Sequence, residues 1–256
     1  MMESEIKFHE YKKWDSSNSL VLTSFPTIGL VSTISGSFLV RSLKMKLVGA
    51  IVSGKLPPVA LIHEGRASPA FRIYSSQQKC GPDNRCDQLT IILSEFMPRL
   101  DAIEPLSAEV LNWADEKDVG LLVSLEGLNS SVPLVGDPKV FGVGSTSRTR
   151  KLIKEYKLEP LEEGMVSGFP GVLLYQATMR NQDVLTLLAE TRPDYPDARA
   201  AARLLEILGK MVPNLKIDPG PLLKEAELIE KQILESIENA KPSSPVIPEL
   251  PLSMYG

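Results

Sequence analysis

Chemically reactive side chains are scarce in this chain of 256 residues. It has two histidines, His9 and His63, and two cysteines, Cys80 and Cys86. A histidine-dependent catalytic triad would have to use one of these histidines, and no G-x-S-x-G nucleophile elbow occurs in the sequence. A metal site of the usual His and Cys type would be short of ligands. We therefore predict no catalytic residue, no bound metal and no cofactor.

The sequence also lacks an excess of positive charge and any long apolar run. Its formal net charge is -4, so no bulk basic field is present to hold nucleic acid or an anionic membrane. No stretch of about 18 apolar residues occurs, which argues against a membrane span. The charged first segment "MMESEIKFHEYKKW" has no apolar core of the kind that secretory signals need. We expect a cytoplasmic protein with no nucleic-acid or membrane partner.

Both cysteines stand in one short segment, "KCGPDNRC". A disulfide within such a loop is geometrically possible. Because disulfides are scarce in cytosolic proteins, we expect the pair Cys80 and Cys86 to be free and reduced, with the disulfide as the alternative.

Apolar segments of strand length alternate with segments of helical periodicity over about residues 18–212. This alternation is typical of an α/β protein, so we predict three layers with a mostly parallel central sheet and helices on both faces. One stretch, "PPVALIHEGRASPAFRIYSS", is expected to form two strands joined by the turn "HEGRASP". The other predicted strands are "SLVLTSFP", "KLVGAIVSG", "QLTIILSEF", "VGLLVSLEGL", "KVFGVGST" and "DVLTLLAET".

The composition changes twice toward the C-terminus. Residues 1–220 form the predicted α/β core, and residues 221–240 carry one narrow apolar stripe between charged flanks, typical of an amphipathic helix. Residues 241–256 contain prolines at every third position, which favours an extended, flexible tail. These prolines are Pro242, Pro245, Pro248 and Pro251.

Two loops resemble fragments of anion-binding loops. The segment "FPTIGL" precedes a predicted helix, whose first backbone N–H groups could hold an anion, but it contains no lysine or arginine. The segment "FGVGST" holds two glycines, yet the complete phosphate-loop and dinucleotide-binding patterns are both absent. We expect the second loop to be a strand end that caps the next helix through Ser145 or Ser147.

Three stretches resemble one family. They are "LTSFPTIGLVSTISGSFLVRSL", then "MVSGFPGVLLYQATMRNQDVLTLLAETRPDYPDARAAARLLEIL", and the last three residues. In the second stretch a glycine-rich turn and helix lead to a strand and then to a Pro-Asp entry into another helix. On these residues the chain resembles the archaeal proteasome assembly chaperones, relatives of the second eukaryotic type. Ser24 stands where the opening of that family usually carries glycine.

The resemblance implies a phosphorylase-like or peptidyl-hydrolase-like fold and a homo-oligomeric chaperone rather than an enzyme. It also implies proteasome core α subunits as the partner. Met254, Tyr255 and Gly256 fit the hydrophobic-tyrosine-any (HbYX) motif of proteasome activators and assembly factors, so we expect these three residues to bind α-ring pockets. Because some archaeal members are described as possible ATP-grasp ligases, the alternative is a nucleotide-dependent ligase with "FPTIGL" and "FGVGST" near its site.

Overall fold

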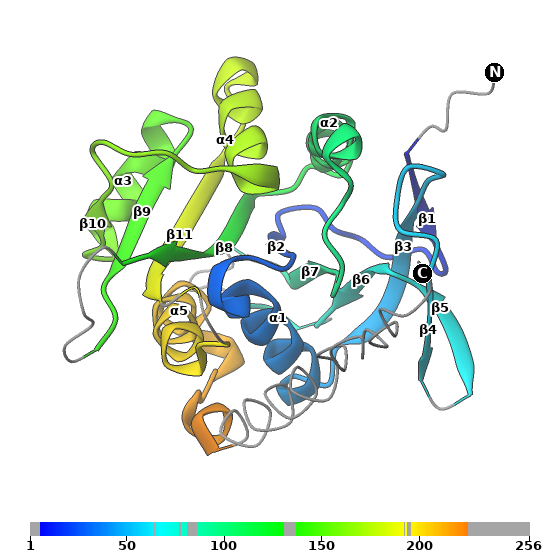
Figure 1. Ribbon diagram of the computed structural model, residues 1–256, viewed down its shortest axis with the longest axis horizontal. Helices are drawn as coiled ribbons and strands as arrows, with labels where there is room; N and C mark the ends of the chain where they lie inside the picture. The colour runs from blue at the N-terminus through cyan, green and yellow to red at the C-terminus, as the bar shows by residue number, and fades with distance from the viewer. Residues whose placement is uncertain are drawn as a thin grey trace, which may run out of the picture.

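The structure is a computed structural model that describes residues 6–63, 65–76, 78–80, 86–130, 137–191, 193 and 196–224. Within these residues, nine strands form one sheet and two more form a separate hairpin (Figure 1). Across the sheet the strands are β1 (Lys7–Glu10), β3 (Lys46–Val52), β6 (Phe71–Ser75), β7 (Leu89–Leu93), β2 (Leu20–Ser24), β8 (Leu121–Asn129), β11 (Val184–Thr191), β9 (Val140–Gly144) and β10 (Glu159–Pro160).

The sheet is mixed, which confirms the α/β class but corrects the prediction of a mostly parallel sheet. Strands β7, β2, β8 and β11 pair in parallel, as do the two residues of β10 with β9. The pairs β1–β3, β3–β6, β6–β7 and β11–β9 are antiparallel. Parallel neighbours need a long crossover, usually a helix, and no helix lies between β3 and β7 in the described part of the chain.

Helices cover both faces of the sheet (Figure 1). Helices α1 (Val31–Ser42) and α5 (Ala198–Met211) pack together on one face, and α2 (Leu100–Glu116) and α4 (Gly168–Arg180) pack together on the other. The remaining helix, α3 (Ser147–Glu155), lies beside β9. Side chains alternate along the buried strands, so each of the two faces has its own apolar core.

Helix α5 shows how the local sequence sets the packing. Asp197 caps the helix, since its carboxylate accepts a hydrogen bond from the backbone N–H of Ala200 at 2.9 Å. The small side chains of Ala200 and Ala201 are fully buried. These alanines let α5 lie close to α1: the Ser35 hydroxyl of α1 donates to the Val31 carbonyl at 2.8 Å and lies 3.5 Å from the Ala201 carbonyl oxygen. The Pro-Asp helix entry noted in the sequence is therefore a capping and packing device.

Two strands of the structure, β1 and β5, are not among the strands that the sequence predicts. Strand β1, which contains His9, lies in the polar N-terminal arm and pairs with β3. The expected turn "HEGRASP" contributes a strand of its own, because β5 (Arg66–Pro69) pairs with β4 (Ala60–His63) to make the hairpin. Tertiary pairing decides both strands, since neither has a continuous apolar pattern.

The expectation of reduced cysteines is wrong: Cys80 and Cys86 form a disulfide. Their Cα atoms are 5.2 Å apart, and the Cys80 backbone N–H donates to the Cys86 carbonyl at 2.9 Å. Both side chains are buried against the α1 and α5 face. The prediction of reduced cysteines relied on the rarity of disulfides in cytosolic proteins. It is wrong here because the local backbone geometry brings the two cysteines together.

Among the described helices, none combines the length and apolar character that a bilayer crossing requires.

Candidate functional site

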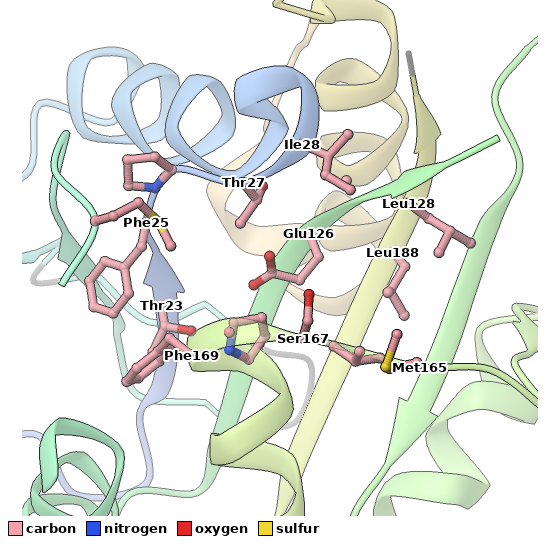
Figure 2. Close-up of a pocket in the computed structure, with 16 residues that line it drawn as sticks. Thr23, Phe25, Thr27, Ile28, Glu126, Leu128, Met165, Ser167, Phe169 and Leu188 are labelled. Carbon is pink, nitrogen blue, oxygen red and sulfur yellow. The ribbon is translucent and has the colours of Figure 1, made fainter. Parts of the chain in front are cut away.

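A crevice of about 420 Å³ opens at the carboxyl ends of the central strands β2, β8 and β11. Its walls come from the loop before α1, residues 25–28, and from the chain that enters α4, residues 165–170. Figure 2 shows the Glu126 side chain between Thr27 of the first wall and Ser167 of the second. In open α/β sheets, ligands bind outside the carboxyl ends of parallel strands, so this crevice is the candidate site.

Of the described residues that line the crevice, Glu126 alone is ionisable. It lies on β8 and is only 5% exposed. Its Oε1 accepts a hydrogen bond from the Ser124 hydroxyl at 2.5 Å. Burial raises the pKa of the Glu126 carboxyl to about 8, and the hydrogen bond from Ser124 only partly offsets this effect. The carboxyl group is therefore protonated and neutral at pH 7.

Hydroxyl groups lie beside this acid on the same face of the sheet. Thr23 of β2 pairs with Ser124 of β8, which pairs with Thr186 of β11, so the three side chains form a row across the sheet. All three residues are buried. Within the described part of the protein, the hydroxyls of Thr23, Thr27 and Thr186 have no hydrogen-bond partner. Thr23 and Thr27 also line the crevice.

The wall before α1 has an unusual backbone. Gly29 and Leu30 both adopt left-handed conformations, with φ of 62° and 49°. For leucine this conformation costs about 1–2 kcal/mol. The Asp197 N–H holds the loop by donating to the Gly29 carbonyl at 2.8 Å. The Ile28 carbonyl lies so close to β8 that a Cβ atom at Gly127 would stand 2.1 Å from the oxygen.

Comparisons with known proteins agree with this fold. A family model described as the PAC2 family matches residues 21–237. The chain belongs to the PAC2 family. An uncharacterised protein of Methanocaldococcus jannaschii, MJ0106, is 31% identical to it over 237 residues, covering 93% of each chain.

Two solved structures from Pyrococcus furiosus are similar to this PAC2 chain. PbaA, described as an archaeal homolog of proteasome-assembly chaperone, is 30% identical, with a TM-score of 0.78 over 91% of this chain and 96% of PbaA. PbaB, described as an archaeal proteasome activator, is 23% identical, with a TM-score of 0.74 over 92% of this chain and 99% of PbaB. At that lower identity, PbaB supports the fold alone.

The structure separates the two loops that the ligase alternative places near one site. The "FPTIGL" loop lines the crevice, at the carboxyl end of β11. The "FGVGST" segment forms the end of β9 and the entry to α3. Because β9 runs antiparallel to β11, with Gly144 opposite Leu185, this segment ends at the other end of the sheet. There Thr146, rather than Ser145 or Ser147, caps α3 and forms a capping box with Thr149. The predicted capping role is confirmed, but the prediction assigned it to the wrong residue.

The predicted docking residues Met254, Tyr255 and Gly256 lie outside the described residues, as does most of the predicted 221–240 helix. Residues 220–224 are helical, and Leu222 is fully buried in the core of the α1 and α5 face. The first turn of that segment therefore packs on its own PAC2 domain.

Sequence reasoning missed Glu126 as a site residue. The segment "VGLLVSLEGL" correctly predicted a buried strand, and the acid inside it was passed over. An acidic residue is almost never fully buried without a partner, so the lone acid of a strand whose other residues are mostly apolar is the available signal.

Proposed function

We propose that this PAC2-family chain is a homo-oligomeric proteasome assembly chaperone, or a protein that binds the proteasome core particle, and not an enzyme. The observation that carries the proposal is the family match over residues 21–237, together with the 30% identity to PbaA, described as an archaeal homolog of proteasome-assembly chaperone. We also propose that the fold resembles those of phosphorylases and peptidyl hydrolases and that the protein is cytoplasmic.

In the proposed interaction, Met254, Tyr255 and Gly256 dock in pockets between adjacent α-ring subunits. The tyrosine ring buries a large area with only two side-chain torsions to order, and its hydroxyl can take one hydrogen-bond partner. Methionine adapts to an irregular apolar groove. Glycine carries no side chain to keep the terminal carboxylate from a cationic or backbone-donor pocket.

Tail and oligomer act together in this mechanism. Three residues bury little surface, so one tail binds weakly, whereas several tails on one ring of subunits bind with avidity. The proline-rich residues 241–253 supply the tether, which reaches roughly 40 Å at about 3.1 Å per residue in polyproline geometry. Light scattering at micromolar concentration should therefore give a mass of several chains. A monomer would remove the avidity mechanism.

The ligase alternative loses support from the placement of its two loops. A nucleotide site needs phosphate donors and metal ligands close together. The two loops lie at opposite ends of the sheet. Among the described residues, no cluster of three His, Cys, Asp or Glu side chains could hold a metal ion.

The decisive experiment measures binding of the full chain to purified proteasome α-rings by surface plasmon resonance. Deleting residues 254–256 should abolish binding. Tyr255→Ala should weaken the binding of a single tail by about 30-fold or more, because buried aromatic anchors commonly contribute about 2 kcal/mol.

Two further variants act as controls. Tyr255→Phe keeps the ring and should lose much less affinity than Tyr255→Ala. One alanine added after Gly256 displaces the carboxylate and leaves the ring intact, so it should also weaken binding. Equal affinity of the intact and truncated chains would show that the tail does not bind α-rings.

A further inference from the structure

We propose that the crevice around Glu126 binds a small, uncharged and largely apolar molecule that presents a carbonyl oxygen to the Glu126 carboxyl group. This function goes beyond proteasome binding and does not depend on the C-terminal tail. The ligand would accept hydrogen bonds at the floor of the crevice and bury its apolar body against the two walls.

The walls set the apolar part of the ligand. Aromatic rings of Phe25 and Phe169 lie on one side of Glu126, and the aliphatic side chains of Leu128 and Leu188 lie on the other (Figure 2). The volume of about 420 Å³ lies within the range of ordinary small-molecule sites. These walls can surround a molecule of one or two rings.

The hydrogen-bonding groups of the crevice determine the polar part of the ligand. Ser124 donates to Oε1 of Glu126, which leaves the proton of the neutral acid for Oε2. Within the described residues Ser124 is the one hydrogen-bond partner of Glu126, so the O–H of Oε2 is available to a ligand. The buried hydroxyls of Thr23 and Thr27, two residues that line the crevice, have no partner within the described residues. These are donors for an acceptor such as a carbonyl oxygen.

The charge of the site excludes charged ligands. Among the described residues, no lysine, arginine or histidine lines the crevice, so a bound anion would have no countercharge from these side chains. Helix α4 begins at the crevice, and its N-cap residue Ser167 makes no side-chain capping bond. The positive end of that helix disfavours a bound cation. A neutral molecule with an acceptor matches both conditions.

The hydroxyl of Thr23 is an independent sign of a ligand. Thr23 is only 1% exposed, and its Oγ1 has no partner in the described part of the chain although it lines the crevice. Burying a hydroxyl without a hydrogen bond destabilises a fold, and valine would fill the same space without that penalty. A ligand oxygen that accepts a hydrogen bond from Thr23 would remove this penalty.

The test uses four probes of similar size and different charge: benzamide, benzoate, benzylamine and toluene. Methionine methyl groups labelled with ¹³C report binding to the full chain, since Met97 and Met165 line the crevice. Met45 and Met211 belong to the core of the opposite face and serve as internal controls. Benzamide should shift only the first pair. It should bind about 2- to 10-fold more tightly than toluene, as expected for one net hydrogen bond.

Variants separate binding from folding. Thr23→Val should weaken benzamide binding about 2- to 10-fold, the loss expected for one hydrogen bond. Thr90→Val is the matched control, because Thr90 on β7 is equally buried and unpartnered within the described residues but does not line the crevice. Glu126→Gln keeps an N–H donor and should bind benzamide equally at pH 6.5 and pH 9.5. The parent protein should lose affinity at the higher pH.

Three results would overturn the proposal. The first is the absence of any shift at Met97 and Met165 up to the solubility limit of benzamide. The second is tighter binding of benzylamine or benzoate than of benzamide, which would make the crevice an ion site. The third is equal loss of benzamide affinity in Thr23→Val and Thr90→Val. Deleting residues 254–256 should leave probe binding unchanged, so failure here and failure of the proteasome proposal are distinguishable.

Discussion

Two loops at opposite ends of the parallel strands differ in how their side-chain hydroxyls are bonded. At the amino end of β11, the Ser145 hydroxyl donates to the Gln182 carbonyl at 2.6 Å and accepts from the Val184 N–H at 2.9 Å. Nearby, Asp183 accepts hydrogen bonds from Thr146 and Arg148. At the carboxyl end, the hydroxyls of Thr23 and Thr27 have no partner among the described residues, and Glu126 has one.

This difference teaches how to tell a structural loop from a binding loop in the same sheet. The segment at residues 141–146, which ends β9 and enters α3, looks more like an anion site in the sequence. Its hydroxyls are nevertheless bonded: Thr146 caps α3 and donates to Asp183, and Ser145 donates to Gln182. The loop at residues 25–28 looks plainer, yet it leaves polar atoms without partners beside a cavity. Between these two loops, the unsatisfied Thr27 hydroxyl beside the crevice, rather than glycine content, marks the candidate site.

The largest expected effect concerns the pH dependence of stability at the carboxyl end. The Glu126 pKa of about 8 in the folded protein exceeds the ordinary glutamate value of 4.5, so the folded state keeps a proton that the unfolded state releases between these pH values. The stability contributed by the neutral acid is present below pH 4.5 and is lost as pH rises toward 8. The loss is about 1.4 kcal/mol per pH unit, or on the order of 4 kcal/mol between pH 5 and pH 8.

Urea titrations of the parent protein and Glu126→Gln at several pH values measure this effect. The parent should lose stability relative to the variant as pH rises. Glu116→Gln removes an exposed acid of α2 and should follow the parent. Parallel curves for the parent and Glu126→Gln would show that Glu126 titrates normally.

The next effect is steric and acts on the wall of the crevice. Gly127→Ala should destabilise the protein by about 3 kcal/mol, because the new methyl group would stand 2.1 Å from the Ile28 carbonyl oxygen. Gly209→Ala in α5 is the control, since the nearest atoms to the new Cβ beyond the backbone of that helix, on Ile217, would be 3.8 Å away. That control should stabilise the fold by about 0.5–1 kcal/mol. Equal stability of both variants by thermal unfolding would contradict the close approach.

At the amino end, Thr146→Ala should destabilise the protein by about 1–2 kcal/mol. The change removes the cap of α3 and one donor to Asp183. Thr146→Ser retains the hydroxyl and should recover most of the loss. Denaturant unfolding measures both variants, and an unchanged midpoint for Thr146→Ala would mean that this end is no better satisfied than the other.

The smallest effect has the opposite sign. Thr23→Val should leave stability unchanged or raise it by less than about 1 kcal/mol, because it removes a buried hydroxyl that has no partner within the described residues. Thr23→Val and Thr146→Val therefore make the same chemical change at the two ends, and their effects on stability can be compared directly. A loss of more than about 1 kcal/mol in Thr23→Val would reveal a bonded hydroxyl and remove the contrast between the ends.

Much of the fold follows from sequence periodicity. The strands around Leu22, Ile91, Val123 and Leu187 are continuous apolar runs, and such runs specify buried central strands. The polar strand β1 and the hairpin strand β5 could not be predicted this way, since their partners rather than their own patterns make them strands. The disulfide escaped for a similar reason: the spacing of two cysteines does not fix their backbone approach.

The crevice shows the same limit. Periodicity places Glu126 in a strand, but its burial comes from residues 25–28 and 165–170, far away in the sequence. The "FPTIGL" loop was identified as a helix start with backbone donors, and the structure adds that its threonine hydroxyl has no partner within the described residues. Which hydroxyls stay unpaired depends on the assembled fold, so no local pattern could reveal it.

The position of β2 in the middle of the sheet also governs when the protein can fold during synthesis. Its neighbours β7 and β8 begin at Leu89 and Leu121, so β2 leaves the ribosome well before either. At about 5–20 residues per second, the wait for β7 alone lasts about 4–14 seconds. All five residues of β2 are buried in the finished sheet, and during that wait neither edge of β2 has a strand to pair with. The central strand of this sheet is therefore among the first parts of the chain to be made, yet it can pair only after later strands have appeared.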